Sequence, residues 1–98
     1  MKKINLKPFI ELAEDQALRD KVHRAERATL PYKEEARISL GVSHLAAAVN
    51  QHKLVHLSVA KLYLYNLGFS DSDSRHIIWQ GTAEGKFHLD NNFNIVAL

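Results

Sequence analysis

A long stretch without proline or glycine, residues 44–66, is the feature that most constrains what this chain can fold into. Apolar residues recur there at spacings of three and four, which is the period of an α-helix. The pattern predicts a central helix that begins after an N-cap at Ser43 and is covered on more than one side, because the leucines at 54, 57 and 64 widen its apolar face. The polar run at 50–53 is where we expect any break in this helix.

Caps and helix breakers place the other helices. Asp15 is a candidate N-cap, Thr29-Leu30-Pro31 is a break, and Ser70 with Asp73 forms a candidate capping box. Gly41 and Gly81 are interpreted as helix ends. The helices predicted in this way span residues 8–14, 16–28, 32–39 and 71–81.

In the C-terminal tail the spacing of apolar residues changes from that of a helix to that of a strand. Apolar and polar residues alternate over residues 87–89 and again over residues 93–97, on either side of Asn91-Asn92. Asparagine tolerates positive φ, so a β-hairpin with a two-residue turn is expected there. The predicted fold class is therefore α+β, mainly α, with four or five helices packed around the central one and a C-terminal β-hairpin.

Size and composition limit the possible classes of protein. With 98 residues, of which 46% are hydrophobic and 24% charged, the chain resembles one soluble globular domain, residues 1–98. No apolar run approaches the roughly 20 residues that span a bilayer, and the first residues do not resemble a secretory signal. Cysteine is absent, which excludes disulfides and thiolate chemistry. We expect a cytoplasmic protein that does not enter a membrane.

The two helices and the hairpin of the C-terminal half, residues 53–98, follow the order of a winged helix. In a nucleic-acid-binding protein of this kind, Arg75, His76 and Lys86 would meet the nucleic acid. The start of the candidate reading helix, however, carries Asp71 and Asp73, and residues 54–98 contain three bases against four acids. Charge therefore disfavours nucleic acid as a partner without removing the alternative.

Basic residues are more frequent in the first half, where Arg19, His23, Arg24 and Arg27 could gather on one outer helix face. Two interpretations stay open: a surface for an acidic partner, or a solvated face with internal ion pairs.

Two histidines, His52 and His56, are one helical turn apart, which is the spacing at which two imidazoles can share a metal ion. A third ligand would have to come from His88 or Asp90, and the neighbouring Lys53 would oppose a cation. We therefore predict no metal and no cofactor. The chain also lacks a Gly-x-Ser-x-Gly elbow and a glycine-rich phosphate loop, so no catalytic residues and no enzymatic activity are predicted.

The surplus of aromatic and aliphatic side chains leaves one functional hypothesis. A single stripe cannot bury all of them in a small domain, so part of the surface should meet another chain. The candidate contact residues are Leu57, Tyr63, Leu64, Tyr65 and Trp79. The alternative is that the protein's own helices cover them. We predict a small regulatory or adaptor-type protein that binds proteins, as a homodimer, with a winged-helix-like nucleic-acid-binding regulator as the alternative.

Overall fold

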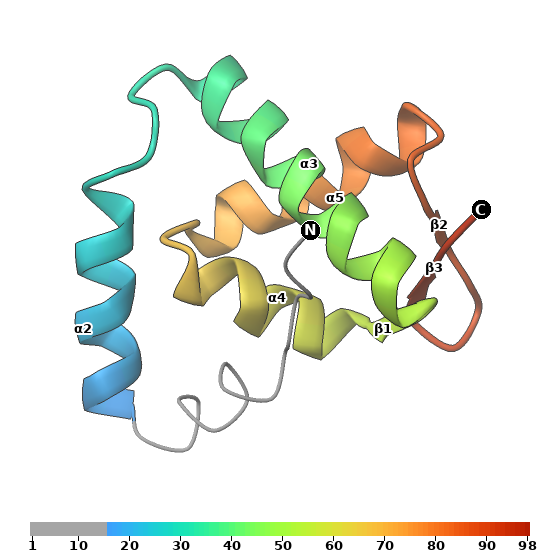
Figure 1. Ribbon diagram of the computed structural model, residues 1–98, viewed down its shortest axis with the longest axis horizontal. Helices are drawn as coiled ribbons and strands as arrows, with labels where there is room; N and C mark the ends of the chain where they lie inside the picture. Colours follow the sequence, from blue (N-terminus) through green and yellow to red (C-terminus); the bar gives the residue numbers. More distant parts are fainter. Residues whose placement is uncertain (1–15) are drawn as a thin grey trace.

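The computed structural model describes residues 16–98. Four helices and a small antiparallel sheet form there, so the predicted α+β, mainly α class is confirmed (Figure 1). The helix expected over residues 8–14 and the cap expected at Asp15 lie outside the described residues. The elements are α2 (Gln16–Arg27), α3 (Glu34–His52), β1 (Leu54–His56), α4 (Leu57–Asn66), α5 (Asp71–Ala83), β2 (His88–Leu89) and β3 (Asn94–Val96).

The apolar stretch at 44–66 does not form one helix. The helix α3 ends at His52, where Lys53 takes a φ of 67°, and the chain continues as β1 and then α4. Backbone hydrogen bonds fix this break, because the Ala97 amide donates to the Lys53 carbonyl and the Leu57 amide donates to the Phe93 carbonyl. The prediction of a continuous helix was wrong, and the break lies at the polar run where we expected it.

The predicted stop at Gly41 is also wrong, because α3 runs through it from Glu34 to His52. A Cβ atom at position 41 would lie 2.1 Å from Cδ1 of Ile77. The glycine therefore serves close packing between α3 and α5 rather than helix termination, and Ser43 lies inside the helix instead of capping it.

Close packing also explains Gly81, which was expected to end α5. The helix continues to Ala83, and a Cβ atom at position 81 would lie 2.2 Å from Cζ of the buried Phe87 ring. At the other end of α5 the predicted capping box is confirmed. The Asp73 amide donates to Ser70 Oγ (3.0 Å), and the Ser70 amide donates to Asp73 Oδ2 (3.1 Å).

The predicted hairpin forms, and β1 adds a strand that was not predicted. The order is β1-β3-β2, with Ile95 of β3 opposite Val55 on one side and opposite Leu89 on the other. The turn differs from the expected two-residue type. Positive φ falls on Phe93 (62°), and Asp90 Oδ1 accepts hydrogen bonds from the amides of residues 92 and 94.

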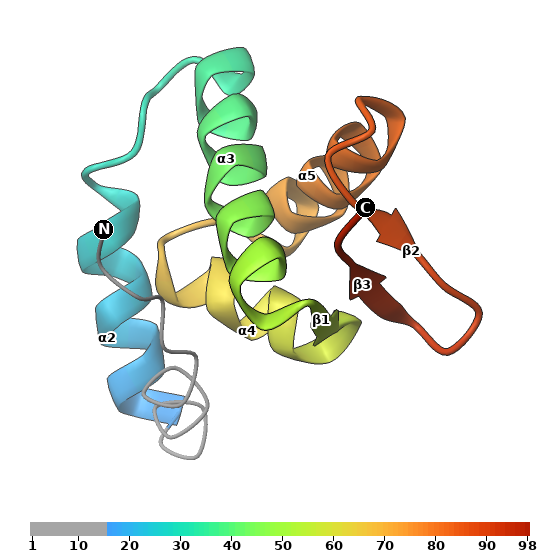
Figure 2. The ribbon, with the colours of Figure 1, turned by 45° about the vertical axis from the view of Figure 1, so that its right-hand side comes forward.

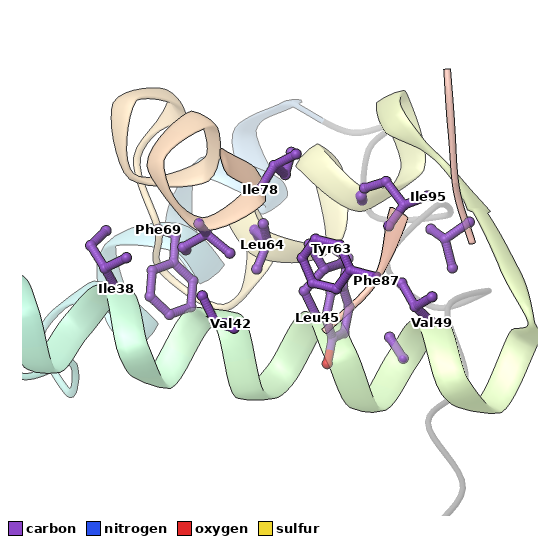
Figure 3. Packing of buried hydrophobic residues seen from close by; sticks show 14 residues of the cluster. Ile38, Val42, Leu45, Val49, Tyr63, Leu64, Phe69, Ile78, Phe87 and Ile95 are labelled. Atoms are coloured by element: carbon purple, nitrogen blue, oxygen red, sulfur yellow. The ribbon is translucent and has the colours of Figure 1, made fainter. Parts of the chain in front are cut away.

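The core lies between α3, α4, α5 and the sheet (Figure 3). Along α3, Ile38, Val42, Leu45 and Val49 follow one face and point toward the other elements. The helix–helix–hairpin order proposed for the C-terminal half is present, with α3 and β1 before it. The remaining core side chains are Ala48, Val55, Ala60, Tyr63, Leu64, Phe69, Ile77, Ile78, Phe87 and Ile95.

The helix α2 lies at one edge of the molecule, on the side of α4 (Figures 1 and 2). None of its residues is buried, and it contacts α4 through hydrogen bonds and ring stacking. The His23 ring stacks on Tyr65 with centroids 4.0 Å apart, and its Nδ1 donates to the Tyr65 carbonyl at 2.8 Å. The Tyr65 hydroxyl donates to Asp20 at 2.7 Å, and the Arg19 guanidinium lies 5.5 Å from the Tyr65 ring centroid. His23 and Arg19 therefore face α4, and the basic outer face considered for this helix is not a single surface.

Asp73, in the first turn of α5, joins three helices. Its carboxylate accepts hydrogen bonds from Arg27 of α2 and from Arg37 of α3, whose Nε is 3.2 Å away. The side chain is buried, which raises its pKa, but the bonds from Arg27, the Ser70 amide and Arg37 outweigh that effect. The net result is a pKa below the ordinary value of an aspartate.

We expect Gly81→Ala to lower the free energy of unfolding by about 2 kcal/mol. Alanine normally stabilises a helix interior by about 1 kcal/mol over glycine, but here the methyl group must displace the buried Phe87 ring. Urea unfolding of a double-mutant cycle checks this. Phe87→Leu should lose less stability in the Gly81→Ala background than alone. It should add simply to Gly85→Ala, whose own cost is backbone strain at a φ of 73° and not contact with Phe87, since no atom lies within 4 Å of a Cβ built at position 85. Additivity in both cycles would contradict the packing explanation.

Asp73→Asn should lower the free energy of unfolding by about 2–3 kcal/mol at neutral pH, since it leaves Arg27 and Arg37 without their carboxylate. A carboxyl whose pKa is depressed by folding contributes stability that is fully present above its unfolded pKa and lost as pH falls through its folded pKa. The difference in the free energy of unfolding between wild type and Asp73→Asn should therefore be constant above about pH 4 and shrink below it. Asp71→Asn is the matched control: its exposed ion pairs should change stability by less than about 1 kcal/mol. A gap between wild type and Asp73→Asn that persists in acid would contradict the ion-pair account.

Candidate docking groove

An open groove of about 540 Å³ lies between α4, α5 and β2. Its walls are mainly apolar, and they include Leu57 and Trp79, two of the five residues predicted to contact a partner. We name it the Trp79 groove. The lining residues are Leu57, Lys61, Arg75, Ile78, Trp79, Thr82, Ala83 and Leu89.

Helical spacing explains why α5 has this face. Arg75, Ile78, Trp79, Thr82 and Ala83 are related by steps of three and four, so they lie along one side of the helix. The opposite side carries Ser74, Ile77 and Gly81 and is buried against the core. Trp79 therefore points outward, and 72% of it is exposed to solvent, a high value for the largest apolar side chain.

Three charged side chains lie together at one end of the groove. Asp71 receives both nearby cations: Lys61 Nζ is 3.7 Å from its Oδ1, and Arg75 Nη2 is 3.1 Å from its Oδ2. All three side chains are substantially exposed, so water screens these pairs. One carboxylate facing two cations leaves this rim with a net positive charge.

The other three predicted contact residues lie away from the groove. Tyr63 and Leu64 are buried in the core, so a partner at the surface cannot touch them, and burial raises the pKa of the Tyr63 hydroxyl. Tyr65 is half-buried against α2, and its hydrogen bond to Asp20 raises its pKa further than burial does. The predicted set is thus divided among the groove, the core and the α2 contact. Four of the five residues lie on α4, after the break at 53, so it is their position around and along this one helix that divides them.

The three residues considered for nucleic-acid contact lie on or after α5. Arg75 is on the groove wall beside Asp71, His76 Nδ1 is 3.2 Å from a carboxylate oxygen of Glu34, and Lys86 is exposed before β2. Two of the three candidates thus have a carboxylate within ion-pair distance. Asp71, exposed in the first turn of α5, offsets part of the positive charge that Arg75 and Lys61 would present to a phosphate.

The histidine pair does not have the geometry expected of one helix. His52 ends α3, whereas His56 is the N-cap of α4, with its Nδ1 accepting from the Ser58 amide at 3.2 Å. Across residues 16–98, no group of three histidine, aspartate or glutamate side chains is placed to hold a metal ion.

Comparisons with known protein families, with curated proteins and with solved structures find no match for this chain. Within the described part of the chain, no helix has the length and apolar character needed to cross a membrane. The groove is therefore interpreted from its own chemistry.

Sequence reasoning missed most of the groove. It identified Leu57 and Trp79 but left out Ile78, Ala83 and Leu89 as wall residues. The spacing around Trp79 contained part of the signal, because Thr82 and Ala83, three and four residues later, are its neighbours on a helix face. The contribution of Leu89 depends on how the hairpin packs beside α5, which helical periodicity does not report.

The fluorescence of Trp79 should report an open groove. This is the only tryptophan in the chain, so all indole emission comes from the groove wall. We expect an emission maximum close to that of the urea-unfolded protein, and acrylamide quenching nearly as efficient as in urea, because the indole is largely in water. A blue-shifted emission that is protected from acrylamide, and that does not change on dilution, would mean that the chain itself covers the groove.

Proposed function

We propose that this protein is a small, non-enzymatic regulatory or adaptor-type protein that acts by binding another protein at the Trp79 groove. The observation that carries the proposal is the exposed indole of Trp79 on an apolar wall formed by two helices and a strand. Tryptophan is among the residues that contribute most to protein–protein binding, and a desolvated apolar centre with a polar rim is the usual anatomy of such contacts.

The magnitude of the hydrophobic effect supports this interpretation. Removing a large apolar side chain from water contributes about 1.5–3 kcal/mol, at roughly 25 cal/mol per Å². Trp79 keeps most of that free energy available in the free protein, since it is 72% exposed, and Leu57 and Leu89 beside it are only partly buried. Binding of a partner that covers all three side chains would gain hydrophobic free energy from each of them, and this free energy is not realised while they face water.

Nucleic-acid binding is the competing function, and the winged-helix-like order of the elements favours it. In that arrangement the exposed face of α5 would enter the major groove, where base edges and phosphates are read by basic and amide side chains. In this protein the exposed residues of that face are Trp79, Thr82 and Ala83. Arg75 on the same face is paired to Asp71. The chemistry of the face thus favours an apolar protein surface over a polyanion.

A homodimer and a cytoplasmic location belong to the same proposal as its finer predictions. Sedimentation of the free protein measures the first and localisation of a tagged chain measures the second. Either could fail while the protein still docks a partner at the groove.

Photo-crosslinking in cells that express this protein tests the proposed function. We would replace Trp79 with p-benzoylphenylalanine, which keeps an aromatic side chain at the groove, and use the same replacement of the fully exposed Tyr32 as the matched control. We expect irradiation to give a discrete adduct from position 79 that protease removes and nuclease does not, and no such adduct from position 32.

Two results would overturn the proposal. A nuclease-sensitive adduct from position 79 would assign the face to nucleic acid. The same faint products from positions 79 and 32 would show that the groove binds no macromolecule specifically.

A further inference from the structure

We propose that the occupant of the Trp79 groove is an amphipathic α-helix of another protein, with carboxylates beside its apolar side chains. This inference rests on the proposed function and specifies the partner. Three properties of the groove carry it: its length along α5, the short strand at its edge and the charge of its rim.

The wall formed by α5 has the length of a short helix face. Residues 75–83 span about 12 Å at the helical rise of 1.5 Å per residue, and Ile78, Trp79 and Ala83 are distributed along that wall. A partner helix lying against it would present about two turns, with apolar residues at i, i+3 or i+4, and i+7. This is the spacing by which helices are recognised in apolar grooves.

An extended peptide fits the groove less well. Peptides that bind as strands add to a sheet edge through main-chain hydrogen bonds. The strand at this edge of the groove, β2, consists of His88 and Leu89 alone, and one side of it is already paired with β3. Two residues offer few of the bonds that give such binding its affinity.

The charge of the rim selects an acidic partner. Lys61 and Arg75 share the single carboxylate of Asp71, so a partner carboxylate placed here would complete the pairing of both cations. A basic partner side chain would add a third cation to one acid. Complementary charge of this kind governs specificity and association rate more than total affinity.

The same rim disfavours a second copy of the chain as the occupant. A twofold contact places the same patch on both sides, so each copy would bring two cations and one carboxylate to the contact, four cations and two carboxylates in all, and no complementary acidic surface. Desolvating that excess of positive charge would oppose the apolar gain. We therefore assign the groove to a different chain.

Selection from an unbiased peptide library tests the inference. Random 16-residue peptides displayed on yeast would be selected against the full chain and, in parallel, against Trp79→Ala, with Tyr32→Ala as the control for loss of an exposed aromatic ring. We expect a pool that binds wild type and Tyr32→Ala but not Trp79→Ala. Its sequences should have apolar residues at helical spacing flanked by aspartate or glutamate. Circular dichroism and urea unfolding of each variant verify that it is folded.

A second measurement tests the charge directly. A selected peptide and its analogue with glutamine in place of the acids would be titrated calorimetrically. Wild type should bind the acidic form roughly threefold to tenfold more tightly, the effect of one or two exposed ion pairs. The double variant Lys61→Gln/Arg75→Gln should lose the preference for the acidic peptide while still binding both peptides. The control Lys33→Gln, at an exposed position just before α3, should keep that preference.

The outcomes separate the two proposals. A Trp79-dependent pool with basic flanks, or with residues alternating as in a strand, would overturn the acidic helix and leave the docking function standing. A dimer in sedimentation that Trp79→Ala dissociates would assign the groove to a second copy and overturn the inference. Retardation of random duplex DNA in low salt that Trp79→Ala abolishes would overturn both proposals, and so would the absence of any Trp79-dependent binder.

Discussion

Asp73 holds the first turn of α5 in place through bonds that come from three directions. Arg27 reaches it from α2, Arg37 reaches it from α3, and the Ser70 amide closes the capping box. A buried carboxylate would be costly without partners, and here its one negative charge is paired with two guanidinium groups. Because α2 has no buried apolar side chain, this ion-pair cluster, the contacts of Tyr65 and the bond from Arg27 to the Gly68 carbonyl are prominent among the contacts that join it to α4 and α5.

Two glycines complete the placement of α5. Gly41 lets Ile77 approach the backbone of α3, and Gly81 lets the Phe87 ring lie against α5 itself. With one side of the helix pressed into the core in this way, the residues three and four positions from Trp79 must face outward. The Trp79 groove is thus a consequence of how α5 packs, and its shape depends on residues that a partner would never touch.

Sequence reasoning recovered what local chemistry determines and missed what long-range packing determines. The capping box of Ser70 and Asp73, the C-terminal end of α2 and the existence of the hairpin depend on neighbouring residues, and they could be predicted. The roles of Gly41 and Gly81 could not, because a glycine that ends a helix and one that admits a distant side chain look alike in sequence. The break at Lys53 has the same origin: β1 forms because β3, some 40 residues later, offers it a partner. On α4, after this break, Leu57 lies in the groove while Tyr63 and Leu64 are in the core.

The winged-helix-like order and the chemistry of its surface point to different functions, and the surface has the greater weight. An arrangement of elements sets which helix is presented, but the side chains on that helix decide what it binds. An exposed α5 with lysines and arginines would gain from releasing the counterions of a polyanion. The α5 of this protein presents an indole and an alanine beside the largely buried Ile78, and its one arginine is already paired with the aspartate a turn earlier. Desolvating such a face is favourable against apolar side chains and unfavourable against phosphates, so the same helix that could have read a duplex is here better suited to hold another helix.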